Sequence, residues 1–396
     1  MKQPTGASRA LKFVLLVGVM SLFADFTYEG MRGIAGPYLA LLGASATVVG
    51  VVSGLGELVG YGLRVVSGRL SDRTGQFWPI TIIGYVVQMA AVPALALAGN
   101  WQVAAALIVL ERAGKATRNP PRDVMLSHAA KEIGYGWAFG LHEALDQLGA
   151  LIGPLVVAGV LAIRGDYHLA LAVLVIPAAI TLSILGAARL LYPHPEEMES
   201  EPPNVETQGL PRVFWIYLAA AALVAAGFAD FPLIAFRFQQ SSVVPTAVVP
   251  VFYAVAMGVS GLGSLVLGRL YDRVGIGILV PLTVISAAFA PLVFLGGFWP
   301  ALIGVALWGI GMGVHESIVP AAVARMVPRE RRASAYGLFT AGYGIAWFAG
   351  SALMGVLYDV SFPALIGFSI AAELAAIPLL ILVRHRELSD HGASQG

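Results

Sequence analysis

An eight-residue charged segment occurs twice in this chain, each time between two long apolar runs. It reads GRLSDRTG at 68–75 and GRLYDRVG at 268–275, and Gly, Arg, Leu, Asp, Arg and Gly are shared in register. The copies lie 200 residues apart (268 − 68), about half of the 396-residue chain. A charged turn of this size between apolar runs is typical of a helix–loop–helix hairpin at a membrane surface. The repeat therefore predicts a duplicated bundle of membrane helices.

The composition supports this interpretation. Hydrophobic residues make up 58% of the chain and charged residues 12%, with a mean hydropathy of +0.80. An ordinary soluble domain carries about 25% charged residues, so this chain lacks the polar surface to face water on all sides. With about 20 residues for each membrane-spanning helix, it accommodates roughly twelve. No segments alternate as β-barrel strands do. We expect an all-α polytopic membrane protein with twelve transmembrane helices in two pseudo-symmetric halves of six.

The apolar runs give the expected spans. They are 13–41, 46–67, 78–98, 101–117, 137–162, 168–191, 212–236, 247–268, 277–297, 300–324, 335–358 and 363–384. The segment between the sixth and seventh runs is acidic and proline-rich, which predicts a flexible linker. We therefore expect an N-terminal six-helix bundle at 1–191, a cytoplasmic linker at 192–211 and a C-terminal six-helix bundle at 212–396.

Basic residues fall on one side of this arrangement, which indicates that both termini are cytoplasmic in the cell inner membrane. In the first half they are Lys2, Arg9, Lys12, Arg69, Arg73, Arg118, Arg122 and Lys131. The segment RNPPR at 118–122 is expected to end the fourth helix, since a proline pair cannot continue one, and to stand at the cytoplasmic gate.

The repeat extends beyond the charged segment. FADF occurs at 23–26 and again at 228–231, and a Tyr-Gly pair opens the fifth helix of each half at 135 and 336. Two halves of the same orientation are parallel repeats, and the substrate path in such folds lies between them near mid-membrane.

These residues resemble the major facilitator superfamily over essentially the whole chain. The segment after the second helix resembles motif A of that family, with matches at Gly68, Leu70, Asp72, Arg73 and Gly75. Arg112 with Gly114 is similar to motif B, whose arginine the family associates with proton coupling. Gly149, Gly153 and Pro154 resemble motif C, the signature of drug/proton antiporters, although Val157 and Ala158 replace its final glycine pair.

The motif A residues fit a gating role. Glycines at 68 and 75 allow close helix approach and positive φ in a tight turn, and Asp72 can attract a neighbouring helix N-terminus. The resemblance implies that this latch holds the two halves together in the outward-facing state. The alternative is a solvated basic turn that only sets topology. The gating residues we expect are Gly68, Asp72, Arg73, Gly75, Asp272 and Arg273.

Charged residues inside the membrane are candidates for function, because burial there is costly. Asp25, Glu29 and Arg32 are spaced by four and three residues and share one face of the first helix. The resemblance implies that this helix lines the central cavity. Asp25 is the preferred proton carrier, because burial favours its neutral form. The alternative is that Glu29 and Arg32 pair and only fix helix packing.

Further ionisable residues complete the candidate set. Asp230 in the seventh helix corresponds to Asp25, and Pro232 can kink the helix there. Arg112 needs a carboxylate partner, for which Asp25, Glu29 and Asp146 are candidates. His142 lies one turn from Asp146 and can relay protons; a helix-packing bond is the alternative, and a zinc site lacks further ligands. The proton-coupling candidates are Asp25, Glu29, Arg112, Asp146 and Asp230.

The remaining candidates are assigned to the substrate cavity. They are Tyr28, Arg32, Glu57, His142, Arg237, His315, Glu316 and Tyr343. Aromatic side chains among them can stack on an amphiphilic ligand, although packing is their commoner role in membrane helices. Glu373 in the last helix is solitary and is expected to be neutral or near an interface.

We interpret the chain as a secondary transporter that works by alternating access, with proton-coupled efflux of small amphiphilic compounds as the leading function. Proton-driven uptake of a polar metabolite is the second hypothesis. A membrane-embedded enzyme is the third, disfavoured because no nucleotide loop or hydrolase motif occurs. Protons are preferred to sodium because the carboxylates lie beside arginines. The expected partners are a small-molecule substrate, protons and membrane lipid, for a monomer without cofactor, metal or nucleic acid; cysteine is absent.

Overall fold

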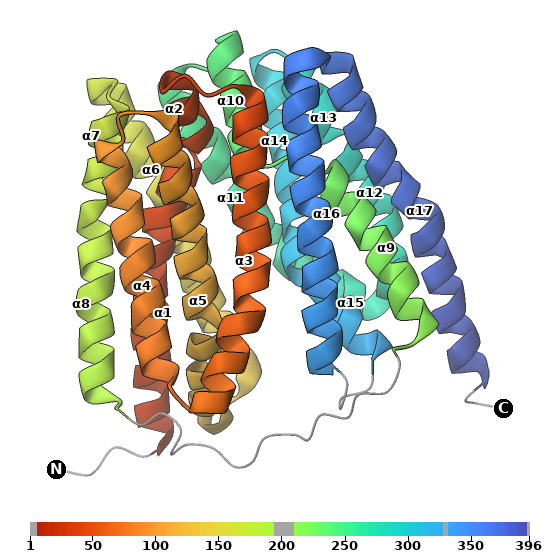
Figure 1. Ribbon diagram of the computed structural model, residues 1–396. Coiled ribbons are helices and arrows are strands. Elements are labelled where there is room, and N and C mark those ends of the chain that lie inside the picture. Colours follow the sequence, from red (N-terminus) through yellow and green to blue (C-terminus); the bar gives the residue numbers. More distant parts are fainter. Residues whose placement is uncertain (1–5, 194–209, 328–331, 394–396) are drawn as a thin grey trace. The chain divides into compact units, whose positions relative to one another are not determined.

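The computed structural model describes residues 6–193, 210–327 and 332–393, and these parts consist of helices joined by short turns (Figure 1). The chain forms two compact units. The first is Met1–Gly43, Val59–Pro202 and Pro245–Ala254, and the second is Ala44–Leu58, Pro203–Val244 and Val255–Gly396. These units follow packing, whereas the expected halves follow the repeat, so the division at 192–211 stays a prediction. Most of that linker lies outside the described residues.

The first unit is a bundle of long helices, in which α1, α4, α5, α6 and α8 run alongside one another (Figure 1). Its helices are α1 Gly6–Arg32, α2 Ala35–Leu41, α4 Phe77–Ala94, η1 Leu95–Leu97, α5 Trp101–Ile133, α6 Tyr135–Arg164, α7 Tyr167–Val173, α8 Val175–Leu191 and η3 Thr246–Val248. Two further helices have residues in both units, α3 Ala46–Thr74 and α11 Val249–Val274.

The second unit is also a helical bundle, in which α9 packs against α16 and α17 and α12 packs against α14 and α17. Its helices are α9 Arg212–Gly227, α10 Phe231–Ser241, η4 Gly275–Ile278, α12 Leu279–Ala287, α13 Phe289–Leu295, α14 Phe298–Gly313, η5 Val314–Ile318, α15 Val319–Met326, α16 Arg332–Val360 and α17 Phe362–Ala393. The segment η5 is a π-helix that connects α14 to α15.

Eleven segments of the described chain are long and apolar enough to cross a membrane. The expected fourth span is α5, which carries Glu111, Arg112, Lys115 and Arg118 within its first 18 residues and is therefore too charged to be counted by composition. The chain is a multi-pass membrane protein, and the predicted twelve-helix, all-α fold is confirmed.

Several of the expected spans are divided into shorter helices, among them the first and the seventh. The first divides into α1 and α2 at Gly33 and Ile34. The seventh divides into α9 and α10 where Phe228 and Asp230 take extended backbone angles (ψ 109° and 144°), close to Pro232 as predicted. Freed carbonyl groups at the second break receive side-chain donors, as a membrane interior requires. Ser369 Oγ donates to the Gly227 carbonyl at 2.6 Å, and Trp308 Nε1 donates to the Ala229 carbonyl at 2.8 Å.

The repeated charged segment was expected to be a turn, and this is wrong for most of its length. Residues 68–74 form the end of α3, and α11 likewise continues to Val274. Only the final glycines leave the helix, with φ of +64° at Gly75 and +72° at Gly275. The positive φ is therefore confirmed at Gly75, which ends the helix as glycines at this position commonly do, whereas Gly68 is helical.

The proline pair was expected to end the fourth helix, and this is also wrong. α5 continues through Pro120 and Pro121 to Ile133. A proline at 120 removes the donor for the carbonyl of Ala116, and Ser67 Oγ on α3 donates to that carbonyl instead, at 3.0 Å. A Cβ at Gly68 would lie 3.5 Å from Pro120, an ordinary van der Waals contact, so the proline does not require a glycine there. A hydroxyl on the neighbouring helix thus compensates for the proline.

The helix pair α1 and α6 is held in close contact by two glycines. A Cβ at Gly149 would clash with the carbonyl oxygen of Leu22, and one at Gly153 would clash with that of Phe26. Both glycines belong to the segment that resembles motif C. Gly159, ten residues along the same helix, has no atom within 4 Å of its Cβ position. Motif C therefore has a packing function in this chain.

Substituting Gly149 with alanine should lower the thermal unfolding temperature of the purified protein in detergent, because backbone must separate from backbone. A cost of about 1–3 kcal/mol is expected for such overpacking. Gly159→Ala on the same helix is the matched control and should leave the unfolding temperature unchanged or slightly higher, since alanine is the better helix former. Equal effects of the two substitutions would show that α1 and α6 do not pack as described.

Candidate functional site

Four ionisable side chains form a column along α5. Glu111, Lys115, Arg118 and Arg122 are spaced by four, three and four residues and so lie on one helical face. Arg118 has no exposed surface, and Glu111 and Arg122 are buried. Charged groups buried in this number need partners, and α1, α4 and Asp123 on α5 itself provide them.

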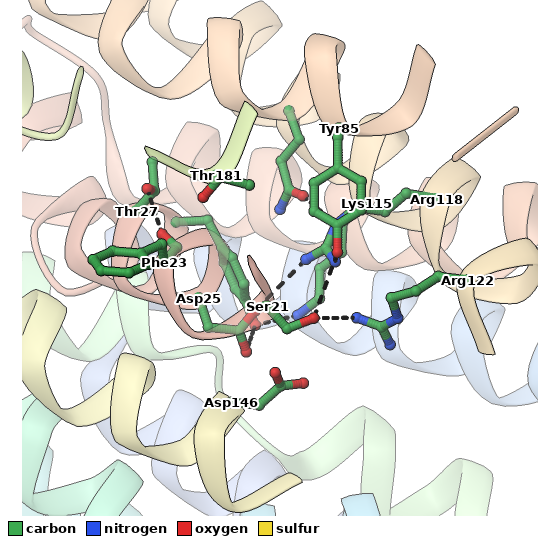
Figure 2. Close-up of polar contacts among 12 residues, drawn as sticks. Ser21, Phe23, Asp25, Thr27, Tyr85, Lys115, Arg118, Arg122, Asp146 and Thr181 are labelled. Carbon is green, nitrogen blue, oxygen red and sulfur yellow. Dashed lines mark hydrogen bonds and ion pairs between the residues drawn. The ribbon is translucent and has the colours of Figure 1, made fainter. Parts of the chain in front are cut away.

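Arg118 is the centre of the network. Its Nε donates to Gln88 Oε1 at 2.6 Å, its Nη1 donates to the Tyr85 hydroxyl at 2.7 Å, and its Nη2 lies 3.6 Å from Asp25 Oδ1. The guanidinium also lies over the Tyr85 ring, 4.3 Å from the centroid. Figure 2 shows Tyr85, Arg118 and Asp25 pointing toward one another. Arginine stays charged when buried, so this position holds a permanent positive charge.

Glycines on α4 and α5 bring Arg118 to this depth. A Cβ at Gly84 would lie 2.6 Å from the backbone nitrogen of Arg118, and one at Gly114 would lie 2.6 Å from that of Gln88. The backbones of α4 and α5 are therefore in contact at both glycines. Gln88 Nε2 also donates to Glu111 Oε1 at 2.8 Å, so the amide connects the column's carboxylate to its guanidinium.

The predicted stripe on α1 faces this column. Asp25 accepts a hydrogen bond from the Tyr28 hydroxyl at 3.3 Å, and Lys115 donates to that hydroxyl while its ammonium lies 3.8 Å from the Tyr28 ring centroid. Glu29 accepts a hydrogen bond from Tyr253 at the start of α11. Asp25 and Glu29 are both buried. The stripe thus contacts protein polar groups rather than lipid.

A second part of the network lies along α6. Arg122 Nη1 donates to Ser21 Oγ at 3.1 Å, and Ser21 Oγ lies 3.0 Å from His142 Nε2. His142 Nδ1 lies 3.4 Å from Asp146 Oδ2. Figure 2 shows Ser21 between Arg122 and the Asp25 region, with Asp146 nearby. Hydroxyl and imidazole groups in series are suited to passing protons.

Arg112, the motif B arginine, lies beside a carboxylate of its own helix. Its Nε lies 3.7 Å from Glu111 Oε2, the neighbouring residue on α5. The arginine that the structure places at Asp25 is Arg118, which was expected at the end of the fourth helix together with Arg122. Arg32 is buried at the end of α1. The structure therefore brings Asp25 together with α5 through Arg118, which was not among the expected partners.

Asp230 is held in a different way in the second unit. Its Oδ1 accepts from Trp347 Nε1 at 3.1 Å, and its Oδ2 accepts from Ser351 Oγ at 2.8 Å. Asp230 is buried and immediately precedes α10. The two repeated aspartates thus differ in the partners that surround them: Asp25 lies beside Arg118, and Asp230 accepts hydrogen bonds from an indole and a hydroxyl.

His315 and Tyr343 meet beside a small, mainly apolar cavity of the second unit. His315 Nδ1 is hydrogen-bonded to the Tyr343 hydroxyl, and the His315 ring lies 4.6 Å from that of Phe228. The cavity is lined by Tyr217, Ala221, Val224, Leu279, Thr283, Val314, His315, Val319, Tyr343 and Leu380. Glu316 is exposed, and Ser260 Oγ donates to it at 3.5 Å.

Several other candidates lie apart from these clusters. Arg237 donates to the carbonyl of Phe294 at 3.1 Å and lies 4.8 Å from the Phe362 ring, among aromatic side chains. Glu57 is half-buried on α3. Asp72 and Arg73 are exposed, as is Arg273, while the side chain of Asp272 lies outside the described part of the chain. No group of three or more metal-binding side chains was found in the residues that the structure describes.

Sequence reasoning missed Tyr85, Gln88 and Arg118 as site residues. The spacing of Glu111, Lys115, Arg118 and Arg122 was a usable signal, because it continues one helical face across the proline pair. Gln88 and Tyr85 give no such signal, since a single polar residue in an apolar run does not reveal its partner.

Comparison with known proteins identifies the class. The sequence model of the Major Facilitator Superfamily matches residues 15–317 and 282–396. The chain belongs to this family, and it is a transporter rather than an enzyme. An uncharacterized protein of Mycobacterium tuberculosis is 44% identical over 390 residues, 96% of this chain and 95% of the relative. An uncharacterized MFS-type transporter of Methanocaldococcus jannaschii is 24% identical over 369 residues, 88% and 89% of the two chains.

More distantly related proteins match different shares of this chain. Multidrug resistance protein MdtH of Edwardsiella ictaluri is 28% identical over 166 residues, 41% of this chain and 39% of that protein. Among solved structures, a mutant of the nucleoside transporter NupG superposes with a TM-score of 0.77 at 13% identity, covering 93% of this chain and 99% of that one. A mutant of the peptide transporter POT gives 0.70 at 14% identity, covering 94% and 93%. These structures share the fold.

Removing either partner of the Asp25–Arg118 pair should destabilise the protein more than removing both. Leaving one buried charge without its partner costs about 3–5 kcal/mol, so Asp25→Asn and Arg118→Gln should each lower the unfolding temperature in detergent. The double variant should lose less unfolding temperature than the two single variants lose together. Arg69→Gln, at an exposed position on α3, is the control and should have little effect. Simple additivity would show that the two side chains do not interact.

Proposed function

We propose that this protein exports small amphiphilic compounds across the cell inner membrane in exchange for protons, by alternating access of its two halves. The observation that carries this proposal is the buried contact between Asp25 and Arg118. A carboxyl group beside a permanent positive charge has two stable partners, the proton and the guanidinium. Proton binding to Asp25 weakens its attraction to Arg118, and this change is the coupling event.

The groups around Asp25 favour a proton rather than a metal ion as the coupling ion. Asp25 is surrounded by the cations Lys115 and Arg118 and by the Tyr28 hydroxyl. A sodium ion needs several oxygen ligands and is repelled by neighbouring cations, whereas a proton needs only one acceptor. Ser21, His142 and Asp146 form a series of proton-accepting groups from α1 to α6. We infer that protons reach Asp25 along this series.

The substrate class is inferred from the cavity of the second unit. Most of its lining is apolar, with Tyr217, His315 and Tyr343 as the polar or aromatic contributors. Ligand sites commonly combine apolar walls with a few polar groups. The partial likeness to MdtH, named as a multidrug resistance protein, favours the same class. The basic residues on one side of the predicted membrane topology support cytoplasmic termini.

Reconstitution in liposomes tests the proposal. With a pH-sensitive dye inside, addition of amphiphilic cations should drive protons in the opposite direction in the wild type. Asp25→Asn should abolish this proton movement, because an amide cannot exchange the proton. Glu143→Gln, at an exposed position on α6, is the matched control and should behave as the wild type.

Two other results would change the conclusion. Protons that move together with a polar metabolite would make the protein an importer, which the polar network of the first unit also permits. Full proton exchange in Asp25→Asn would remove Asp25 from the mechanism and leave Asp146 and Asp230 as the carboxylates to be tested.

A further inference from the structure

Glu373 is a carboxyl group that the proposed transport mechanism does not use. It lies on α17 with no exposed surface, and neither carboxyl oxygen has a hydrogen-bond partner. Serine 286 on α12 has its hydroxyl facing this carboxyl, and that hydroxyl also lacks a partner within bonding distance. Buried polar groups are nearly always hydrogen-bonded in native proteins, so this pair of unpartnered groups needs an explanation.

The carboxyl lies against the break between α9 and α10. A Cβ at Gly227, the last residue of α9, would lie 2.7 Å from the carbonyl oxygen of Ser369 and 3.1 Å from Cγ of Glu373. Ser369 Oγ donates to the Gly227 carbonyl at 2.6 Å. Across the break, Gly311 of α14 is close to both the Phe228 ring and Ser286 Oγ. One turn of α17 is thus packed directly on the broken backbone.

Positive charges do not offset Glu373. Neither carboxyl oxygen has a hydrogen-bond donor among the described residues, and none of the ion pairs found there includes Glu373. The helices α9 and α16 pack against α17 and carry titratable residues. On α9 these are Arg212 and Tyr217, and on α16 they are Arg332, Tyr336, Tyr343, Tyr358 and Asp359. The side chain of Arg332 lies outside the described part of the chain. Beyond the break, Asp230 accepts hydrogen bonds from Trp347 and Ser351, and the His315 ring lies 4.6 Å from that of Phe228.

A carboxylate at this position would be a buried charge without a partner, which proteins avoid by taking up a proton. A sodium ion does not fit the same groups, because one carboxyl and one hydroxyl supply too few oxygen ligands. We propose that Glu373 is a second proton-binding site, separate from the Asp25 network, and that its bound proton keeps α17 packed against the break between α9 and α10. In the neutral form the acid is both a donor and an acceptor, and Ser286 is the group positioned to complete it.

Loss of this proton has a structural consequence. The ionised carboxyl requires several donors, and the Ser286 hydroxyl is the one that α12 directs at it, so it must recruit water or separate α17 from Gly227. The backbone at 228–230 is already outside a helix and is the part of the second unit that can respond. The site thus links protonation in α17 to the packing of the broken helix.

Glu373→Gln tests the proposal without depending on transport. Glutamine has the shape of the neutral acid, so both proteins should unfold at the same temperature at about pH 5. A group that is neutral in the folded protein stabilises it at low pH, and this contribution is lost as the pH rises. The wild type should therefore unfold progressively below the variant as the pH rises to about 9, by at least about 2 °C.

The controls separate the alternatives. Glu143→Gln removes an exposed carboxyl from α6 and should follow the wild type at every pH. The infrared band of a protonated carboxyl should be present in the wild type near neutral pH and absent from Glu373→Gln. If the variant is the less stable protein at high pH, Glu373 is ionised and the proposal fails. If sodium chloride, compared with choline chloride, stabilises the wild type but not the variant, the site binds sodium and the proposal is also overturned.

Discussion

The burial of one guanidinium group determines much of the structure of the first unit. Arg118 cannot lose its charge, so a position without exposed surface requires hydrogen-bond acceptors and an anion around it. Gln88, Tyr85 and Asp25 meet that requirement from α4 and α1. They reach Arg118 because the glycine at 84 lets α4 and α5 touch along their backbones. Helix packing and the ionic network are therefore one arrangement, and neither is possible without the other.

The fold could be predicted from the sequence because membrane helices depend mainly on the length and polarity of apolar runs. The helix ends could not, because they depend on neighbours that are distant in sequence. Pro120 and Pro121 do not end α5, since Ser67 on another helix provides the missing donor. The segment 68–74 is helical although its charges suggested a turn. In both cases a tertiary contact overrides the local preference of the chain.

The candidate site was predicted in part for the same reason. Asp25 and Glu29 were found because helical spacing places them on one face, and a charge in an apolar run has few explanations other than function. Both were considered as candidate partners of Arg112, whereas the structure places Arg118 3.6 Å from Asp25. Arg118 was missed because the fourth helix was expected to end there, and a residue in a loop is not considered as part of a buried face. Correct helix ends would have given the whole column on α5.

The break between α9 and α10 has a consequence for the charge on Asp230. Since α10 begins directly after it, this aspartate lies at the end of a helix where unpaired amide groups create a partial positive charge of roughly half an elementary charge. That macrodipole adds to the hydrogen bonds from Trp347 and Ser351 in accommodating an anion. In the first repeat the same aspartate lies inside an unbroken helix, next to Arg118. The break thus gives the second carboxylate a source of field in the backbone that the first one lacks, and exchanging a neighbouring side chain does not remove it.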